Sequence, residues 1–347
     1  MIGRRLTRGL ALASALAVTI PLSVASVSGA STTLSATATF PVALSSSLPL
    51  ARLHFSSPVT ASALPPVTTY PSLSTQWQQI GPNDVQAVTH SVIVPASRYL
   101  INVPTRIVCA KTCTATTRVT HAVSSVGSTL WLQELLATLD YLPVAFQPAS
   151  KSWDYSEPTV GSFTWRFSSL PASLRAQWHV GLYGVITKGA VMRFQNAHNL
   201  GTSGVADATT WKTLIEAART GQKNTAGYNY VDVSMAYPET LTLYANGHNI
   251  FHATVNTGIA QSPTETGTYP VYVRFVTTTM SGTNPDGSTY HDTGIPWVSY
   301  FHGGDALHGF IRSSYGWPQS LGCVEMRFND AHTVFPYTPI GTLVTVR

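Results

Sequence analysis

The strongest constraint on the fold is an alternation of apolar and polar residues that starts at Tyr230 and continues to the C-terminus. A period of two is typical of β-strands with one buried face. Two of the alternating segments flank Asn246-Gly247, a dipeptide that favours a two-residue hairpin turn. Residues 228–347 are therefore expected to be mainly β. Within them we expect a turn at 284–287 and strands at 230–233, 241–244, 250–255, 269–276, 297–301 and 343–346.

A helical pattern of apolar residues precedes this β region. Four leucines spaced at i, i+3, i+4 and i+7 follow Ser128, a residue suited to cap the N-terminus of a helix. Two more amphipathic helices are expected to start at Thr187 and near Asp207. Residues 128–217 are thus predicted to form a small three-helix domain, which is interrupted by an insertion at residues 148–178.

The first 30 residues have the layout of a secretory signal peptide. Arginines at positions 4, 5 and 8 precede an apolar stretch, and the small residues at positions 28–30 offer a cleavage site. An uncut membrane anchor is the alternative, but the apolar stretch of about 16 residues is shorter than the ~20 that span a bilayer. We therefore expect an exported protein.

Residues 31–90 are rich in Ser, Thr, Ala and Pro, and include runs such as Ser45-Ser46-Ser47. This composition is typical of a loosely ordered, low-complexity arm. Residues 91–127 alternate more regularly, and we expect a short β segment there, around Cys109 and Cys113, whose role the sequence does not indicate.

Charged residues make up only 10% of the chain, against about 25% in an average globular protein. The net charge of +5 includes the three N-terminal arginines, and the remaining basic residues are scattered. Surfaces that bind nucleic acid carry clusters of lysine and arginine. We therefore expect no nucleic-acid partner, and we expect no cofactor.

The chain contains three cysteines. Cys109 and Cys113 are four residues apart, whereas Cys323 lies 210 residues further on. If the first two pair, Cys323 remains a free thiol in an oxidising compartment, where an odd cysteine either bridges two chains or serves as a reactive group. A small buried apolar side chain is the other interpretation of Cys323.

Histidines, glycines and a cysteine are concentrated between His302 and Cys323. A thiol attacks carbonyls as the thiolate, and an ordinary cysteine has a pKa of about 8.5, so a neighbouring base is needed. His308 is the closest histidine in sequence, and Gly309 after it lets the backbone pass close to a ligand. Gly322 permits a tight turn that could aim backbone N–H groups at a developing oxyanion.

Two other interpretations of these residues stay open. His302 and His308 are ordinary polar residues at a rim, or they join Cys323 as ligands of a zinc ion. The second is disfavoured because the chain has no Cys-x-x-Cys or His-Glu-x-x-His motif. We therefore expect no metal.

The order of these residues resembles the L,D-transpeptidase catalytic domain of the YkuD type. His308-Gly309 is followed, 14 residues after the glycine, by Cys323 within Ser320-Leu321-Gly322-Cys323-Val324. The family pattern is His-Gly, a spacer, then Ser/Thr-His-Gly-Cys, usually with an arginine two residues after the cysteine. Residues 262–269 and 341–344 also resemble family segments. The resemblance spans about residues 228–347 and implies a β-sandwich.

Two positions depart from the family pattern. Leu321 replaces the usual histidine, which is tolerable if that position contributes only its backbone. Glu325 stands where arginine is common, so the carboxylates of the substrate need another partner. Arg312 and Arg327 are the candidates for that role.

The resemblance implies a reaction on peptidoglycan. Cys323 would attack the bond between an L-centre and D-alanine in a tetrapeptide stem, and the thioester would pass to an amine of a neighbouring stem, giving a 3→3 cross-link. Water as the acceptor would make the protein a carboxypeptidase. His308 would act as base and then acid, the carbonyl of Gly309 would orient it, and the amides of Gly322 and Cys323 would form the oxyanion hole. The substrate contacts implied are His302, Ser320, Leu321, Arg312 and Arg327.

The helical region resembles the peptidoglycan-binding domain 1 family, mainly at residues 187–195 and 204–211. Phe194 and Trp211 are interpreted as core residues rather than ligand contacts. This resemblance implies targeting to the cell wall, and we expect the protein to be a monomer. Sortase-like and papain-like enzymes are disfavoured, because the first have a longer spacing from histidine to cysteine and in the second the cysteine comes first. A non-catalytic wall-binding protein is the alternative from another class.

Overall fold

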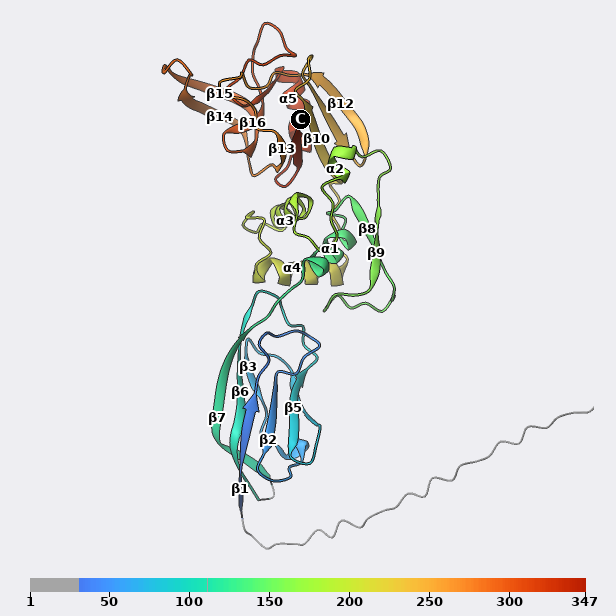
Figure 1. The fold of residues 1–347 in the computed structure, drawn as a ribbon, viewed down its shortest axis with the longest axis vertical. Helices are drawn as coiled ribbons and strands as arrows, with labels where there is room; N and C mark the ends of the chain where they lie inside the picture. The colour runs from blue at the N-terminus through green and yellow to red at the C-terminus, as the bar shows by residue number, and fades with distance from the viewer. Residues whose placement is uncertain (1–30, 111) are drawn as a thin grey trace, which may run out of the picture.

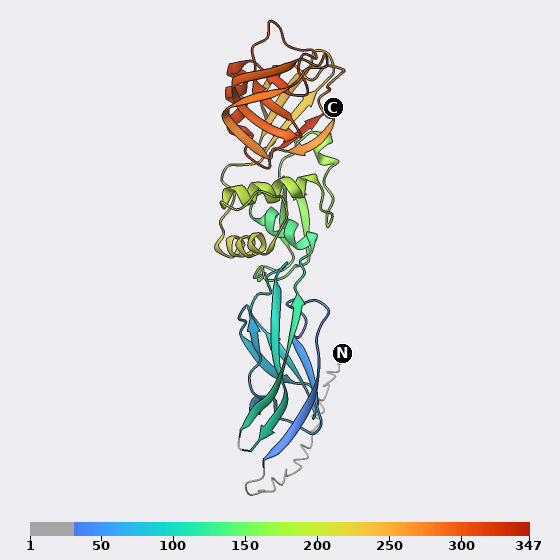
Figure 2. The same cartoon turned by 90° about the vertical axis from the view of Figure 1, so that its left-hand side faces the viewer.

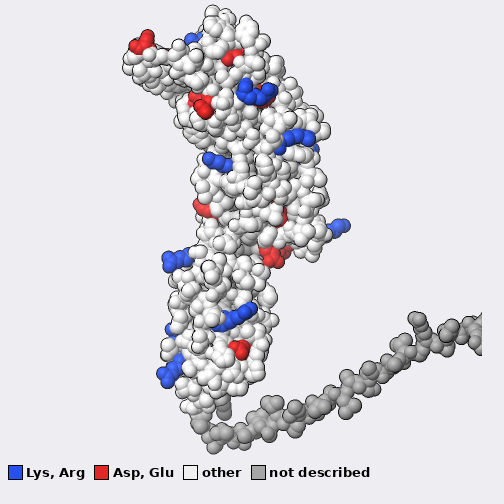
Figure 3. Space-filling model, in the orientation of Figure 1, with Lys and Arg blue, Asp and Glu red and all other residues white. Residues whose placement is uncertain are grey.

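The computed structural model describes residues 31–110 and 112–347 (Figure 1). The signal peptide expected at residues 1–30 lies outside the described residues. A β-domain, a helical domain and a second β-domain follow one another along the long axis of the molecule (Figure 2). The charged side chains on the face shown in Figure 3 are spread over an otherwise uncharged surface, in keeping with the low charged fraction.

The expectation that residues 31–90 form a low-complexity arm is wrong, because this segment supplies most of the first β-domain. Seven strands form one sheet: six follow the order β3-β6-β1-β2-β5-β4, and β7 pairs with β6 off this path. In β2, Ala51, Leu53 and Phe55 are buried while the residues between them are exposed. Serine and threonine fill the exposed faces of these strands, and their abundance made the segment resemble a low-complexity sequence. The bounds are β1 (Thr32–Thr39), β2 (Ala51–Phe55), η1 (Ala61–Ala63), β3 (Thr68–Tyr70), β4 (Thr75–Gln79), β5 (Asp84–Thr89), β6 (Arg98–Cys109) and β7 (Cys113–Ser124).

The β segment expected over residues 91–127 is a long hairpin of two 12-residue strands, β6 and β7. Their pairing runs from Arg98 opposite Ser124 to Cys109 opposite Cys113. Cys109 and Cys113 form a disulfide at the end of this hairpin. Cys323 is therefore the free cysteine of the chain.

The helical domain contains α1 (Thr129–Thr138), α3 (Val185–Ala197) and α4 (Ala208–Thr220). The side chain of Ser128 accepts a hydrogen bond from the Trp131 N–H and caps α1. β8 (Val144–Pro148) ends where the expected insertion begins and pairs with β9 (Gly161–Trp165) inside it. The short helix α2 (Ala172–Arg175) follows within the insertion. Phe194 and Trp211 are buried in the hydrophobic core of this domain.

The C-terminal domain is mainly β and consists of two sheets. The first has the order β12-β11-β10-β18-β13, and the second has the order β14-β15-β16-β17. Side chains from both sheets form one hydrophobic cluster that includes Val231, Leu243, Phe301 and Val324. The bounds are β10 (Asn229–Ser234), β11 (Thr240–Ala245), β12 (His248–Thr254), β13 (Gly267–Pro270), β14 (Val273–Thr283), β15 (Thr289–His302), β16 (Asp305–Gly309), β17 (Val324–Met326), α5 (Phe328–Val334), η2 (Phe335–Tyr337) and β18 (Leu343–Val346).

Candidate active site

A cavity of about 860 Å³ in the C-terminal domain gathers most of the chemically active residues that the sequence singled out. The lining residues come mainly from the β14–β15 hairpin, from β16 and the segment after it, and from the segment that leads into β17. The candidate residues that line the cavity are His308, Arg312, Ser320, Leu321 and Cys323.

The pairing of β16 with β17 brings His308 and Cys323 to one face of the sheet. The two strands are parallel, and His308 is paired with Glu325. Side chains two residues apart in a strand point to the same face, so Cys323, just before β17, shares the face of Glu325. His308 and Cys323, 15 residues apart in sequence, therefore face the same cavity.

The imidazole of His308 is 3% exposed and is held by the backbone of the next residue. Its Nδ1 lies 3.0 Å from the carbonyl oxygen of Gly309. A carbonyl can only accept, so Nδ1 carries the proton and Nε2 is left as the acceptor. Burial lowers the pKa of His308, and the hydrogen bond to Gly309 opposes this only in part. The ring is therefore neutral at neutral pH, as a general base must be.

Cys323 holds its proton in the absence of substrate. Burial raises the pKa of its thiol to about 12, and the negative charges of Asp305 and Glu325 add to this, while the backbone of Ala306 opposes it. Sγ lies 3.7 Å from the carbonyl oxygen of Gly304. Because so little thiolate is present at neutral pH, attack on a carbonyl requires proton transfer to a base such as His308.

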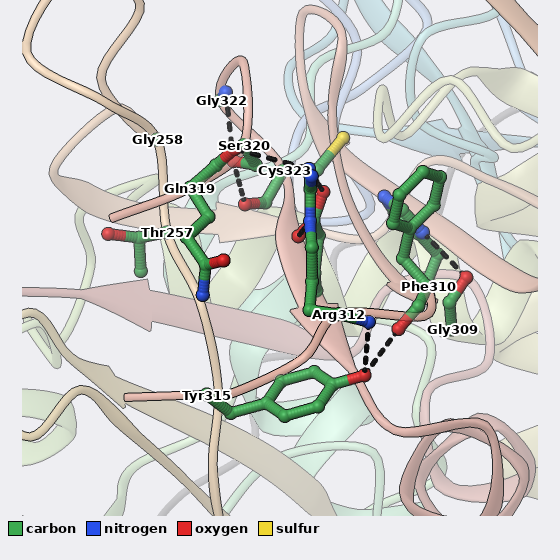
Figure 4. Close-up of polar contacts among 12 residues, drawn as sticks. Thr257, Gly258, Gly309, Phe310, Arg312, Tyr315, Gln319, Ser320, Gly322 and Cys323 are labelled. Atoms are coloured by element: carbon green, nitrogen blue, oxygen red, sulfur yellow. Dashed lines mark hydrogen bonds and ion pairs between the residues drawn. The ribbon is translucent and has the colours of Figure 1, made fainter. Parts of the chain in front are cut away.

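The turn before Cys323 has a conformation that favours glycine. Gly322 has a φ of 116°, and a Cβ atom there would collide with the carboxylate of Asp305. The Gly322 N–H donates to Ser320 Oγ at 3.2 Å, and the Ser320 hydroxyl donates to the carbonyl of Cys323 at 2.6 Å (Figure 4). The Gly322 amide must therefore leave Ser320 before it can bind an oxyanion.

The two candidate arginines lie in different places. Arg312 lines the cavity and forms a bidentate ion pair with Glu325, with Nε–Oε2 and Nη2–Oε1 distances of 2.8 and 2.7 Å. The hydrogen bond with Glu325 raises the pKa of Arg312. Arg327 is not among the residues that line the cavity, and its Nη1 contacts Thr254 at 3.2 Å and Asp330 at 3.6 Å.

His302 is also absent from the cavity lining. Its ring packs on Tyr269, with 4.4 Å between ring centres, and its Nδ1 lies 3.9 Å from Asp305. Within the described part of the chain, no group of three histidine, cysteine, aspartate or glutamate side chains is arranged to hold a metal ion. His302 and Arg327 are thus separated from the cavity that contains the other candidates.

Sequence reasoning missed the residues that the β14–β15 hairpin contributes to the cavity. Met280 and Asp292 are paired in this hairpin, and both line the cavity together with Tyr290. The alternation along these strands signals that every second residue faces the same way. Both faces carry polar residues, so the pattern does not indicate which face encloses a site.

Comparison with known proteins agrees with this geometry. Residues 228–346 match the family model of the L,D-transpeptidase catalytic domain, YkuD. The C-terminal domain is an L,D-transpeptidase catalytic domain of the YkuD family. Residues 171–214, from just before α2 into α4, match the model of a putative peptidoglycan binding domain. The L,D-transpeptidase and the peptidoglycan-binding domain together imply a peptidoglycan substrate.

Solved structures with similarity to the chain include several L,D-transpeptidases. One from Mycobacterium smegmatis is 10% identical with a TM-score of 0.31, and the match covers 90% of this chain and 99% of that chain. One from Mycobacterium tuberculosis H37Rv is 12% identical with a TM-score of 0.30, covering 86% and 90%. The catalytic domain from E. faecium is 21% identical with a TM-score of 0.32, covering 36% and 100%. A search of curated proteins found no significant match.

An enzyme family that acts on the cell wall suggests an exported protein. None of the helices in the described ranges is both long enough and apolar enough to cross a bilayer.

Proposed function

We propose that the protein is an L,D-transpeptidase that forms 3→3 cross-links in peptidoglycan through a thioester at Cys323. The main support is the shared face of the β16–β17 pair, on which Cys323 and His308 line one cavity. The proposal includes export of a monomeric protein to the cell wall by the signal peptide at residues 1–30.

In the acylation step, Nε2 of His308 removes the thiol proton as Sγ of Cys323 attacks the carbonyl carbon that precedes D-alanine. The C–N bond then breaks, and His308 delivers the same proton to the amine of the departing D-alanine. The Gly309 carbonyl stabilises the imidazolium that exists between the two proton transfers, because it accepts from Nδ1. The product of this step is a thioester on Cys323.

In the second step, an amine of a neighbouring stem attacks the thioester, and His308 takes one of its protons. Collapse of the intermediate releases the thiolate, which recovers a proton from His308. The amide of Cys323, joined by that of Gly322 after it leaves Ser320, would stabilise the oxyanion in both steps. Ser320 and Leu321 line the cavity beside the nucleophile and are proposed as substrate contacts.

The decisive test is the product formed from peptidoglycan that contains tetrapeptide stems. We expect the purified protein to give 3→3 linked muropeptides, identified by chromatography and mass spectrometry, and Cys323→Ala to give none. Equal product from both proteins would refute the proposal. Release of D-alanine without cross-links would identify the carboxypeptidase alternative, in which water is the acceptor.

The active-site thiol can also be tested with a carbapenem, which acylates the nucleophile of enzymes in this family. Mass spectrometry should show one adduct on the wild-type protein and no adduct on Cys323→Ala. An unmodified wild-type protein would favour the alternative of a non-catalytic wall-binding protein.

Wall binding by the helical domain is proposed on the basis of the family match and of exposed apolar side chains. Leu182 and Val205 are each 63% exposed, and the Tyr183 hydroxyl donates to the Gly204 carbonyl, which joins their two loops. Exposed apolar patches often mark binding surfaces. Replacing Leu182 and Val205 with serine should lower retention on insoluble peptidoglycan, whereas Val160→Ser, at an 80% exposed site in the insertion, should not.

A further inference from the structure

The wall of the cavity contains an ion pair that is largely withdrawn from solvent. The side chain of Glu325 is 5% exposed, and that of its partner Arg312 is 31% exposed. Arg312 and Glu325 meet through two parallel N–H···O hydrogen bonds. This two-point geometry fixes the plane of the guanidinium as well as its position.

Further contacts hold Arg312 from other sides. Its Nη2 also donates to the Gln319 carbonyl at 3.1 Å, and its guanidinium carbon lies 4.7 Å from the ring centre of Phe310. The backbone N–H of Arg312 donates to the Tyr315 hydroxyl, which in turn donates to the Phe310 carbonyl (Figure 4). The loop that carries Arg312 is therefore tied back on itself, and the guanidinium has one supported orientation.

Two hydrogens of this guanidinium remain available. A guanidinium has five N–H bonds. The Nε hydrogen and both Nη2 hydrogens of Arg312 are used by Glu325 and Gln319, and the two Nη1 hydrogens have no hydrogen-bond partner among the described residues. Arg312 is also the one arginine or lysine in the cavity lining, where Asp286 and Asp292 are acidic.

We propose that Nη1 of Arg312 binds a carboxylate of the stem peptide and that Glu325 is a positioning residue that holds the guanidinium for this purpose. The identity of the ligand as a stem peptide rests on the proposed function. In the family pattern an arginine usually stands at the position of Glu325. Here the cation comes from Arg312, on a different segment, and position 325 supplies its anchor.

The pair of free hydrogens limits what can bind. Nη1 can serve one carboxylate, and a second carboxylate would meet Asp286 and Asp292 without a cation to neutralise it. The bound group is either the C-terminal carboxylate of D-alanine or a side-chain carboxylate of the third residue. The two share the same chemistry and can be separated with amidated peptides.

Binding can be measured without turnover on the Cys323→Ala variant, by calorimetry with synthetic tetrapeptide stems. We expect the peptide with free carboxylates to bind about tenfold to a hundredfold more tightly than at least one of two analogues, amidated at the C-terminus or at the third side chain. Adding Arg312→Met should remove this preference. Failure of catalysis would not affect this measurement, so the two proposals can fail separately.

The role of Glu325 is tested by Glu325→Gln in the Cys323→Ala background. A positioning role predicts a loss of the preference for the free carboxylate, whereas a purely structural role predicts equal weakening for all peptides. Exchange of the two charges, Arg312→Glu with Glu325→Arg, should restore part of the preference. Arg327→Met, outside the cavity, is the matched control and should leave the preference for the free carboxylate unchanged.

Two results would overturn the proposal. One is equal affinity for the free and both amidated peptides when Arg312 and Glu325 are intact. The other is a preference that survives Arg312→Met. If Glu325→Gln fails to fold, as judged by circular dichroism, Arg312→Lys keeps the charge but loses the two-point contact, and the same loss of preference is expected.

Discussion

Gly189 in the middle of α3 and Gly341 before β18 bring their backbones into contact between the helical and catalytic domains. A Cβ atom on Gly189 would lie 2.7 Å from the Gly341 carbonyl oxygen, closer than real Cβ contacts allow. Tyr230 and Leu343, from the first catalytic sheet, belong to the same hydrophobic cluster as the helices. The two domains are therefore packed as one unit at this boundary.

This contact predicts whether replacing Gly189 raises or lowers the free energy of unfolding. In an isolated helix, replacing glycine with alanine stabilises by about 1 kcal/mol. At Gly189 we expect the opposite, a loss of about 1–3 kcal/mol, because the added methyl group pushes against the Gly341 backbone. Chemical denaturation of the wild type and Gly189→Ala measures the difference.

Gly201 provides the control for that experiment, because a Cβ atom there would meet nothing within 4 Å. Gly201→Ala should leave the free energy of unfolding nearly unchanged. If Gly189→Ala were stabilising, the two domains would not be in the contact described.

The protonated state of Cys323 predicts slow reaction with simple alkylating agents. With a thiol pKa of about 12, the rate of labelling by iodoacetamide should rise about tenfold per pH unit from pH 7 to pH 9. A cysteine in the unfolded chain, with a pKa near 8.5, should react much faster at pH 7. Labelling followed by mass spectrometry over time gives both rates, and a rate independent of pH would indicate a preformed thiolate.

The turn at Gly322 predicts that replacing this glycine lowers both stability and activity. Gly322→Ala would place a methyl group against Asp305 and force alanine into a φ near 116°, so we expect a loss of about 2–4 kcal/mol and little cross-linking. Gly294→Ala is the matched control, because Gly294 also has a positive φ, of 73°, but has open space around it. Thermal unfolding and product assays on both variants should separate steric collision from backbone strain alone.

Buried Glu134 in α1 predicts a pH dependence of stability in the helical domain. Burial raises its pKa from 4.5 to about 6, so the folded state binds this proton more tightly than the unfolded state. The stabilisation is present below about pH 4.5 and is lost as the pH rises through about 6. A shift of this size corresponds to about 2 kcal/mol.

The test compares unfolding of the wild type with that of Glu134→Gln between pH 4.5 and pH 8. The glutamine variant cannot ionise, so its stability relative to the wild type should increase across this range. Glu216→Gln, at an exposed position of α4, is the control and should show no such trend. Parallel curves for all three proteins would contradict the raised pKa of Glu134.

The parts of the fold that were predictable from sequence have strong local signals. The hairpin at Asn246-Gly247 was expected because both residues favour a positive φ, and they have φ values of 50° and 80° in β11–β12. The cap at Ser128 and the helices that start near Thr187 and Asp207 were also evident from local pattern. These features depend on residues within a few positions of one another.

The parts that were missed depend on distant residues or on composition. In the first β-domain, serine and threonine occupy the exposed faces, so the segment resembles a low-complexity arm until its leucines and valines meet in one core. The Arg312–Glu325 pair was not expected, because nothing in the sequence indicates which of two arginines would reach the cavity. In the structure Arg312 reaches Glu325, whereas Arg327 contacts Thr254 and Asp330.

One wall of the cavity belongs to a single continuous stretch of chain, the β14–β15 hairpin of residues 273–302. The nucleophile and the base lie outside this hairpin, just before β17 and on β16. An evolutionary or engineered exchange of this one hairpin could therefore change which peptides enter, while the chemical step keeps its machinery. The residues that line this part of the cavity are therefore encoded in a different stretch of chain from the nucleophile and the base.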